Sequence, residues 1–350
     1  MKVGNGEARR TQRSTAELSL RSLRLSVSKN PIAPPTHNCQ LVCNRLACFQ
    51  TELDGRESRT QTMSPGVETS QLKDIVFWRS LCPKLSITPS QPLTSISSFG
   101  KDLQLRSDDW SVCKKLINED GYFAYDSWFD NGLVDRLADC FNTLTANKIP
   151  CVFAFVYDEF WELLLQLDPM LKDLLGDYEI LPAVWSWFVR HDNQTAFTPH
   201  RDQVRDVLIE DDDHLDYLTI WIPLTDLDHL SSSICVFPAS LDPDYEDSTP
   251  EIRIENMQDV RCLQGKRGSV FCWTTQLAHW GTKQSSHGPP RMSVGYFVQA
   301  SGADPLEDPP LDLSVPMTLE QRLAIIGQQI IDYSREADDD LLRAAAELVG

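Results

Sequence analysis

His200 and Asp202 stand two residues apart in the stretch TPHRDQ, just after an aromatic run, VWSWFVR. In an extended segment successive side chains point to opposite faces, so residues two apart share a face. Imidazole and carboxylate groups are both common metal ligands in proteins. The spacing therefore predicts that His200 and Asp202 bind one metal ion together.

A third ligand has to come from elsewhere in the chain, and the candidates are His214, His229, His279 and His287. His214 lies in an acidic stretch, EDDDHLD, which is typical of a solvated loop. His229 follows TDLD at the end of a strand-like stretch. His279 follows the strand-like GSVFCWTT and leads through a turn into RMSVGYFVQ. We therefore predict that His279 completes the ligand set.

Arg291 and Ser293 begin the strand-like stretch RMSVGYFVQ and share one face of it with Phe297 and Gln299. The apolar residues between them share the other face. An arginine that faces a core needs an anion as its partner. Its guanidinium offers a bidentate fork, and the hydroxyl two residues on adds one donor. The pair predicts a binding site for a small carboxylate.

Two histidines and one carboxylate on one face of an iron ion leave three coordination positions open. This is the arrangement that non-haem Fe(II) oxygenases use for oxygen activation. Zinc accepts the same ligands but has no redox chemistry, so a zinc hydrolase is an alternative. That alternative leaves Arg291 and Ser293 without a role, and the complete set therefore favours iron.

The elements that must position these residues form a β-rich region. Five stretches of β-branched and aromatic residues are separated by turn residues: VWSWFVR, DYLTIWIPL, SICVFP, GSVFCWTT and RMSVGYFVQ. DYLTIWIPL is apolar on both faces, which is typical of a strand covered on both sides. Short strands with long connections predict a mainly β fold with flanking helices, a jelly roll or double-stranded β-helix.

Helical patterns precede and follow the β region. Ser107 is expected to cap a short helix, and Asp130 a longer one with apolar residues at helical spacing. Two further helical stretches, YDEFWELLLQL and DPMLKDLLG, end at Gly176. Thr318 and Gln321 form a capping box for a last helix. Its apolar residues are expected to pack on the core: Leu319, Leu323, Ile326, Ile330 and Tyr333.

Three regions are expected along the chain. Residues 1–106 are predicted to be an N-terminal extension followed by a linker rich in Ser, Pro and Thr with little fixed structure. The first fifty residues hold eight Lys or Arg against two acids, which suggests a transit peptide or a disordered tail. Residues 107–302 are expected to form the jelly-roll domain, and residues 303–350 a Pro-rich connection and C-terminal helices.

Composition limits the classes of partner. The chain has 350 residues and a net charge of -19, which should repel phosphate backbones and disfavours a nucleic-acid partner. No apolar run reaches the length of a membrane span. A small-molecule substrate is expected instead, while the composition leaves the oligomeric state open.

The ten cysteines are scattered, and no secretory signal precedes them, so we expect reduced thiols in an intracellular compartment. That compartment is the cytoplasm or, if the basic N-terminus is a transit peptide, the mitochondrion or plastid. Cys39, Cys43 and Cys48 lie close to His37, but their spacing lacks the CxxC pair typical of a structural zinc site.

From about Ile117 to Val298 the sequence resembles the phytanoyl-CoA dioxygenase family, within the Fe(II)- and 2-oxoglutarate-dependent dioxygenases. EDGYFAYDSWFDNGLVDRL is similar to that family's first strand and helix, and PHRDQ to its HxD segment. LTIWIPLTDL is similar to its next strand. AHWGTKQSS and RMS are similar to the segments that carry its distal histidine and its cosubstrate arginine.

The resemblance implies Fe(II) held by His200, Asp202 and His279, with the far carboxylate of 2-oxoglutarate on Arg291 and Ser293. It also implies O2 as the second cosubstrate. The expected reaction hydroxylates a small or lipid-like organic substrate with release of succinate and CO2. Related halogenases lack the carboxylate ligand, so Asp202 disfavours halogenation.

Two features depart from the patterns of these enzymes. The chain reads SSSICVFPASL where the family has a small-residue turn and then PGSH, which changes the expected substrate pocket. Phe297 stands where nucleic-acid demethylases of the superfamily carry a second arginine, which further disfavours a nucleic-acid substrate. A catalytically inactive jelly-roll binding module of the same family is therefore the alternative function.

Several large side chains near these segments are further candidates for contacts with a substrate. Trp185, Trp187 and Trp221 could line a pocket, although tryptophans on strands are also typical of a core. Arg190 could hold a substrate anion or form a surface salt bridge.

Overall fold

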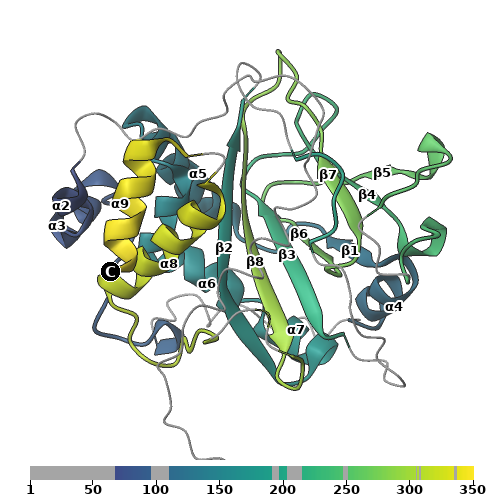
Figure 1. The fold of residues 1–350 in the computed structure, drawn as a ribbon, viewed down its shortest axis with the longest axis horizontal. Helices are drawn as coiled ribbons and strands as arrows, with labels where there is room; N and C mark the ends of the chain where they lie inside the picture. Colours follow the sequence, from purple (N-terminus) through teal and green to yellow (C-terminus); the bar gives the residue numbers. More distant parts are fainter. Residues whose placement is uncertain are drawn as a thin grey trace, which may run out of the picture. The chain divides into compact units, whose positions relative to one another are not determined.

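Strands occupy the middle of the chain, and helices precede and follow them in sequence (Figure 1). The computed structural model describes residues 68–95, 110–190, 197–202, 215–246, 251–304, 306, 309–334 and 337–350. These residues all belong to one compact unit, Cys39–Gly350. The expected N-terminal extension up to residue 67, and Ser107 with its proposed cap, lie outside the described residues.

Two antiparallel sheets form the β core. The larger sheet has five strands, in the order β1 (Tyr122–Tyr125), β6 (Val270–Trp273), β3 (Tyr217–Pro223), β8 (Arg291–Ala300) and β2 (Tyr178–Val189). The smaller sheet has the order β5 (Arg261–Cys262), β4 (Ile234–Phe237) and β7 (Ala278–Gly281). An isolated bridge between His200 and His279 adds the HxD segment beside β7.

Successive segments alternate between the two sheets. From β2 the chain passes to the His200 segment beside β7, then to β3 in the larger sheet. It continues through β4 and β5 in the smaller sheet, returns to the larger sheet in β6, and repeats the exchange with β7 and β8. Two antiparallel sheets linked in this way, with helices at the flank, are a double-stranded β-helix, as the sequence predicts.

The strand register determines which side chains share the face of the larger sheet that carries the candidate site. Residues directly opposite each other in neighbouring strands lie on the same face. Trp187 of β2 is opposite Ser293 of β8, which in turn is opposite Pro223 of β3. Two residues earlier on β3, Trp221 is opposite Gly295. Arg291, Ser293, Trp187 and Trp221 therefore lie on one face.

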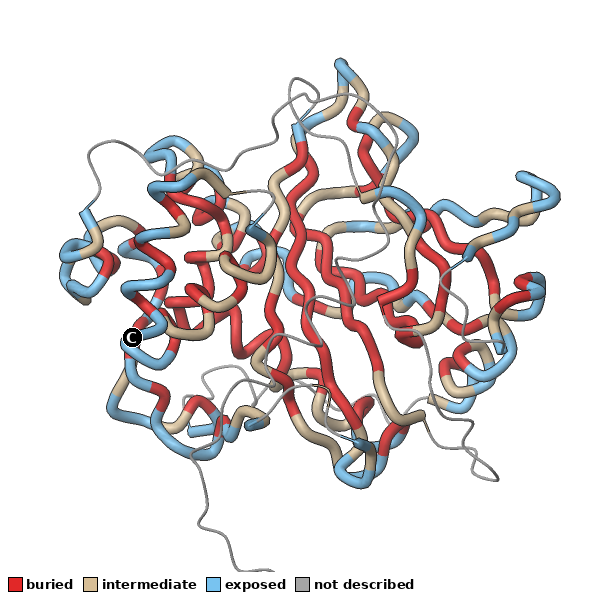
Figure 2. The backbone as a smooth tube through the Cα atoms, in the orientation of Figure 1, coloured by how far each residue is buried: buried red, intermediate tan, exposed pale blue. Residues whose placement is uncertain are grey.

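The other face of the larger sheet packs against helices. The helices that flank the core include α5 (Asn131–Ala146), α6 (Asp158–Leu165), α7 (Asp168–Leu175), α8 (Leu319–Asp332) and α9 (Asp339–Val349). Their apolar residues form one buried cluster with alternate strand residues such as Ile220 and Val298. Figure 2 shows the buried residues running along the long strands and the inner sides of these helices. The two-sided apolar pattern of DYLTIWIPL is thereby explained.

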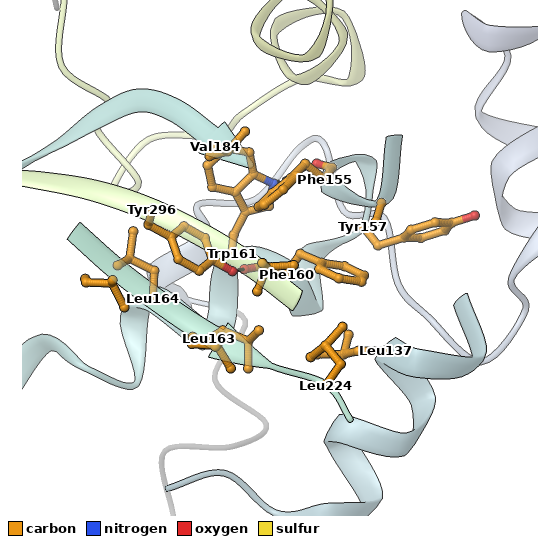
Figure 3. Close-up of a cluster of buried hydrophobic side chains, with 14 of the residues drawn as sticks. Leu137, Phe155, Tyr157, Phe160, Trp161, Leu163, Leu164, Val184, Leu224 and Tyr296 are labelled. Atoms are coloured by element: carbon orange, nitrogen blue, oxygen red, sulfur yellow. Dashed lines mark hydrogen bonds between the residues drawn. The ribbon is translucent and has the colours of Figure 1, made fainter. Parts of the chain in front are cut away.

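Large aromatic side chains fill the space between helices and sheet (Figure 3). The Phe155 ring packs edge-on against the Tyr296 ring of β8, with centroids 5.7 Å apart. The Tyr296 hydroxyl donates a hydrogen bond to the backbone carbonyl of Phe160 in α6. The hydrogen bond fixes α6 on the sheet, and the ring packing fixes the short helix η2 (Cys151–Val156) that precedes it.

Helix boundaries follow the expected signals. Asp130 caps α5 by accepting a hydrogen bond from the Leu133 amide. Gly176 ends α7 with a positive φ of 71°, which favours glycine. Thr318 and Gln321 form the predicted capping box at the start of α8.

Residues 69–81, which the composition predicts to be linker, instead form helices α2 (Thr69–Leu72) and α3 (Ile75–Leu81). Trp78 is completely buried, and its indole donates a 2.7 Å hydrogen bond to the Leu72 carbonyl. Its ring stacks on Phe153, with centroids 5.7 Å apart. Burial of this one tryptophan orders a segment whose composition looks like linker.

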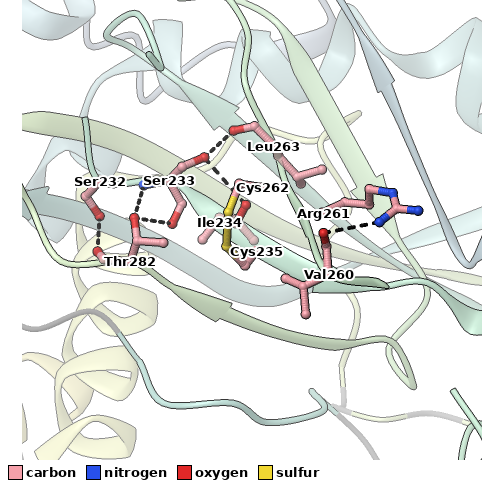
Figure 4. The surroundings of a disulfide bond; sticks show 9 residues. All are labelled: Ser232, Ser233, Ile234, Cys235, Val260, Arg261, Cys262, Leu263 and Thr282. Atoms are coloured by element: carbon pink, nitrogen blue, oxygen red, sulfur yellow. Dashed lines mark hydrogen bonds between the residues drawn. A yellow bond between two sulfur atoms is a disulfide. The ribbon is translucent and has the colours of Figure 1, made fainter. Parts of the chain in front are cut away.

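Cys235 and Cys262 form a disulfide, which corrects the expectation of reduced thiols for these two residues. They are directly opposite each other in β4 and β5, with Cα atoms 4.1 Å apart (Figure 4). The bond joins the short strand β5 to β4. Register across a sheet cannot be read from sequence spacing, so the pairing was not predicted.

Among the described residues, no helix is both long enough and apolar enough to cross a membrane.

Candidate metal centre

His200, Asp202 and His279 lie together between the two sheets. One potential ligand atom from each lies within 4.8 Å of the others. Asp202 Oδ1 is 3.8 Å from His200 Nε2 and 3.5 Å from His279 Nε2. The structure thus brings together the three residues that the sequence analysis selected from distant segments.

Backbone pairing holds the two histidines side by side. The His200 amide donates to the His279 carbonyl at 3.0 Å, and the His279 amide donates back at 2.9 Å. His279 lies on strand β7, where it is opposite Val236. A four-residue strand next to the HxD segment therefore carries the third candidate ligand.

Hydrogen bonds set the ring orientation of both histidines. His200 Nδ1 lies 2.8 Å from the Thr198 carbonyl oxygen, and His279 Nδ1 lies 3.0 Å from the Leu277 carbonyl oxygen. Because a carbonyl can only accept, Nδ1 carries the proton in each ring. Each Nε2 therefore keeps its lone pair, which faces Asp202 and can bind a metal.

Asp202 is held through its other oxygen. Oδ2 accepts a 2.8 Å hydrogen bond from the Thr219 hydroxyl of β3 and a 3.0 Å hydrogen bond from the Trp273 indole of β6. Oδ1 is left to face the two Nε2 atoms. Thr219 and Trp273 therefore orient Asp202, and sequence reasoning missed both.

Electrostatics favour a neutral imidazole at His200. Burial, and next the neighbouring His279, lower the pKa of His200 to about 4. His200 is therefore neutral at pH 7, as metal binding requires. Asp202 and His279 side chains are almost completely buried, whereas 31% of the His200 side chain is exposed. The exposed side of the centre lies at His200.

Arg291 lies on β8 with its charge buried. Its guanidinium lies over the Trp221 ring at 5.5 Å, and burial lowers its pKa to about 10. Nε and Nη1 have no hydrogen-bond partner among the described residues, and neither has the Ser293 hydroxyl, which is completely buried. A buried charge without a partner is costly, so these donors fit an anion.

Arg291 and the metal-ligand residues share one side of the larger sheet. Thr219 and Trp273, which bind Asp202, are directly opposite each other in β3 and β6. Trp221, beneath Arg291, lies two residues after Thr219 on β3 and on the same face. The residues present therefore fit a metal ion bound by one carboxylate oxygen and two imidazoles, with a small carboxylate anchored beside it.

Arg201, between the two HxD ligands, points away from them into a buried ion pair. Its Nη1 lies 2.7 Å from Asp242 Oδ2, and the side chains are 1% and 0% exposed. The same nitrogen donates to the Gln276 carbonyl, three residues before His279. Asp242 follows η3 (Ala239–Leu241), within the segment that departs from the family pattern. Through these two contacts Arg201 links the HxD segment to the residues after η3 and to the turn before His279.

The other candidate residues do not join the centre. His229 and His287 are exposed and lie outside the cluster of possible ligands in the described part of the chain. His214, His37 and the three neighbouring cysteines lie outside the described residues. Arg190 is exposed at the end of β2. Trp221 lies beneath Arg291, and Trp185 and Trp187 line a cavity beside β2.

No protein-family model and no curated protein matches this chain. Similar solved structures include the non-heme alpha-ketoglutarate-dependent epimerase SnoN from nogalamycin biosynthesis. That match has 15% identity and a TM-score of 0.44, and covers 58% of this chain and 95% of SnoN.

HygX from Streptomyces hygroscopicus has 13% identity and a TM-score of 0.43 over 54% of this chain and 86% of HygX. The carbocyclase SnoK has 14% identity and a TM-score of 0.41 over 57% of this chain and 92% of SnoK. SnoN has been solved with Fe3+ and alpha-ketoglutarate, and HygX with iron. Likenesses this distant do not assign the chain to a family, so the resemblance to phytanoyl-CoA dioxygenases stays a prediction.

Proposed function

We propose that this protein is an Fe(II)- and 2-oxoglutarate-dependent oxygenase that oxidises a small or lipid-like organic substrate. The observation that carries the proposal is a combination of two features on one side of the larger sheet. Three metal-ligand side chains present free ligand atoms to one another. Beside them, buried Arg291 and Ser293 present donors without partners among the described residues.

In this proposal, His200 and His279 bind Fe(II) through Nε2, and Asp202 binds it through Oδ1. Bound Fe(II) supplies the redox chemistry that couples decarboxylation of 2-oxoglutarate by O2 to oxidation of the substrate, with release of succinate and CO2. Arg291 and Ser293 bind the far carboxylate of 2-oxoglutarate and so fix its orientation toward the metal.

The walls of the site keep water away from the bound anion. Trp221, Phe271 and Trp273 are at most 3% exposed and lie on the same face of the larger sheet as Arg291. In such an environment the attraction between a guanidinium and a carboxylate is strong. The charge of Arg291, costly while unpaired, becomes a source of affinity for 2-oxoglutarate.

Hydroxylation is the proposed outcome of the reaction. Asp202 occupies the carboxylate position that halogenases need vacant for halide, so the ligand set disfavours halogenation. Membership of the phytanoyl-CoA dioxygenase family is the finer proposal, and it rests on the sequence segments quoted for that resemblance.

Turnover without added substrate tests the proposal. Many oxygenases of this type consume 2-oxoglutarate slowly without substrate, so we expect O2-dependent succinate formation that requires Fe(II). His200→Ala should abolish it, whereas His287→Ala, which changes an exposed histidine outside the cluster, should retain it. Unchanged succinate formation in His200→Ala would contradict the proposal. Activity with zinc alone would favour the hydrolase alternative.

A catalytically inactive binding module is the second candidate. The altered segment FPASL, in which Ala239 and Leu241 form η3, favours it because that segment departs from the family pattern. This candidate predicts that the folded protein consumes no O2 with any substrate.

A further inference from the structure

A cavity lies between the edge strand β2 and the C-terminal helices α8 and α9. It is a small cavity, and part of it is open to solvent. Trp185, Trp187 and Tyr333 contribute aromatic rings to its walls, and Ala337 lines it beside α9. None of the described residues that line it is charged.

Two polar side chains in the walls leave atoms without partners. The Ser186 hydroxyl and Gln329 Oε1 are buried and make no hydrogen bond with the described residues. Ser186 is 9% exposed and Gln329 is 3% exposed, and both line the cavity. Buried polar atoms are usually paired, so this pair points to a ligand group that can both donate and accept a hydrogen bond.

The cavity adjoins the candidate metal centre through shared aromatic walls. Trp187 is directly opposite Ser293, one of the two residues proposed to bind the 2-oxoglutarate carboxylate. The Phe197 ring lies 6.1 Å from the Trp187 ring, 6.2 Å from the Tyr333 ring and 5.6 Å from the His200 ring. A single aromatic ring therefore separates His200, the exposed ligand, from the cavity wall.

We propose that this cavity binds the part of the substrate farthest from the carbon that is oxidised. That part is an uncharged ring or branched alkyl group that carries one hydroxyl or amide. The inference rests on the proposed function, because it assigns the cavity to the substrate of the same centre. Charged groups are excluded, since burying a charge without a partner is far costlier than burying a hydroxyl that finds one.

Ligand-observed fluorine NMR with 4-fluorophenol tests the cavity directly. We expect saturable line broadening with the wild-type protein and at least a tenfold loss of affinity in Ala337→Phe, which fills the cavity. Ala346→Phe, on an exposed position of α9, is the matched control and should bind like wild type. Charged 4-fluorobenzoate should not compete. Equal binding by the two phenylalanine variants would overturn the proposal.

A second variant covers the case in which Ala337→Phe does not fold. Ser186→Ala removes the hydroxyl with almost no change of volume. It should weaken 4-fluorophenol several-fold and leave fluorobenzene, which has no hydroxyl, unaffected. An equal effect on both probes would show that the hydroxyl makes no contact with the ligand, and would overturn the proposed polar recognition.

Mn(II) in place of Fe(II) tests the link to the metal centre. The paramagnetic ion should speed the fluorine relaxation of bound 4-fluorophenol in wild type and not in His279→Ala, which should still bind the probe. Probe binding without this enhancement would overturn the substrate role of the cavity. If Fe(II) and 2-oxoglutarate bind normally but 4-fluorophenol does not bind, the assignment of the cavity is wrong and the proposed function stands. If 4-fluorophenol binds but 2-oxoglutarate does not, the proposed function is wrong, and so is the substrate role of the cavity.

Discussion

Asp202 illustrates how single residues define the centre. Its two oxygens have different tasks: Oδ2 accepts hydrogen bonds from Thr219 and Trp273, and Oδ1 faces the two histidines. Partners of this kind fix the orientation of a ligand and strengthen metal binding. Only Oδ1 of Asp202 is therefore available to bind a metal ion.

Thr219→Val should weaken Fe(II) binding by about 10- to 100-fold, because it removes one of the two hydrogen bonds that orient Asp202. Thr143→Val, on α5 away from the site, is the control. Competition with a fluorescent metal chelator measures both affinities. Equal Fe(II) affinity in the two variants would contradict the orienting role of Thr219.

Arg291→Met should stabilise the protein without ligands and abolish its response to 2-oxoglutarate. The substitution removes a buried charge whose Nε and Nη1 have no partners among the described residues, so the thermal midpoint should rise by about a few degrees. Added 2-oxoglutarate with Mn(II) should raise the midpoint of wild type only. A lower midpoint without ligand would mean that the protein itself already pairs this charge.

At this scale the sequence alone was enough to select the candidate ligands and the candidate anion-binding pair, because HxD spacing and strand alternation carry their signal locally. Thr219 and Trp273 were missed because they are 17 and 71 residues from Asp202, and register alone brings them together. One signal was available. Thr219 is the single polar residue of strand β3, YLTIWIP, apart from the tyrosine at its start.

Between elements, the Arg201–Asp242 ion pair joins the HxD segment to the residues after η3. Side chains of an extended segment alternate, so Arg201 points away when His200 and Asp202 point to the metal. Its bond to the Gln276 carbonyl extends the connection to the turn before β7. The two ligand-bearing segments thus share one anchor, Arg201.

Asp242→Asn should destabilise the protein by about 3–5 kcal/mol, because it leaves the Arg201 charge buried without its ion-pair partner. It should also lower Fe(II) affinity, since the ligand segment loses its anchor. Asp139→Asn, which breaks an exposed pair with Lys84, should cost at most about 1 kcal/mol. Urea unfolding compares the two, and similar losses would contradict the anchoring role.

Strand prediction succeeded where the apolar stretches were long. All five predicted stretches contain strands, but β5 and β7 were missed because Arg261–Cys262 and Ala278–Gly281 contain no β-branched residue. The sequence placed His279 between two strands and did not show that it lies on a strand of its own, β7. Short strands are specified by their neighbours in the sheet rather than by their own composition.

Across the whole described molecule, buried polar contacts at α6 join segments that are far apart in sequence. Asp158 lies 2.7 Å from Arg322 of α8 and accepts a hydrogen bond from the Thr88 hydroxyl. Glu159 accepts from the Ser86 amide. The segment before η1 (Leu93–Ser95) and the C-terminal helix α8 are thus fastened to one turn of α6. The composition of residues 63–107 did not predict this order, because the contacts that order the segment come from residues distant in sequence.

Arg322→Leu should lower the free energy of unfolding by about 3–5 kcal/mol, because Asp158 would keep a buried charge without its ion-pair partner. Fe(II) affinity should be unchanged in the folded fraction, since the ligands lie on the opposite side of the larger sheet. Arg343→Leu, which breaks an exposed pair with Asp340, is the control. Calorimetry of both variants would contradict this account if their stabilities were equal.

An anaerobic titration of the metal-free protein with Fe(II) and then 2-oxoglutarate, followed by visible absorption, tests the proposed iron centre. It requires no knowledge of the substrate. A charge-transfer band should appear only when both components are present, and His279→Ala should lose it. Absence of the band, with Fe(II) left unbound, would contradict the proposed centre and favour the inactive binding module.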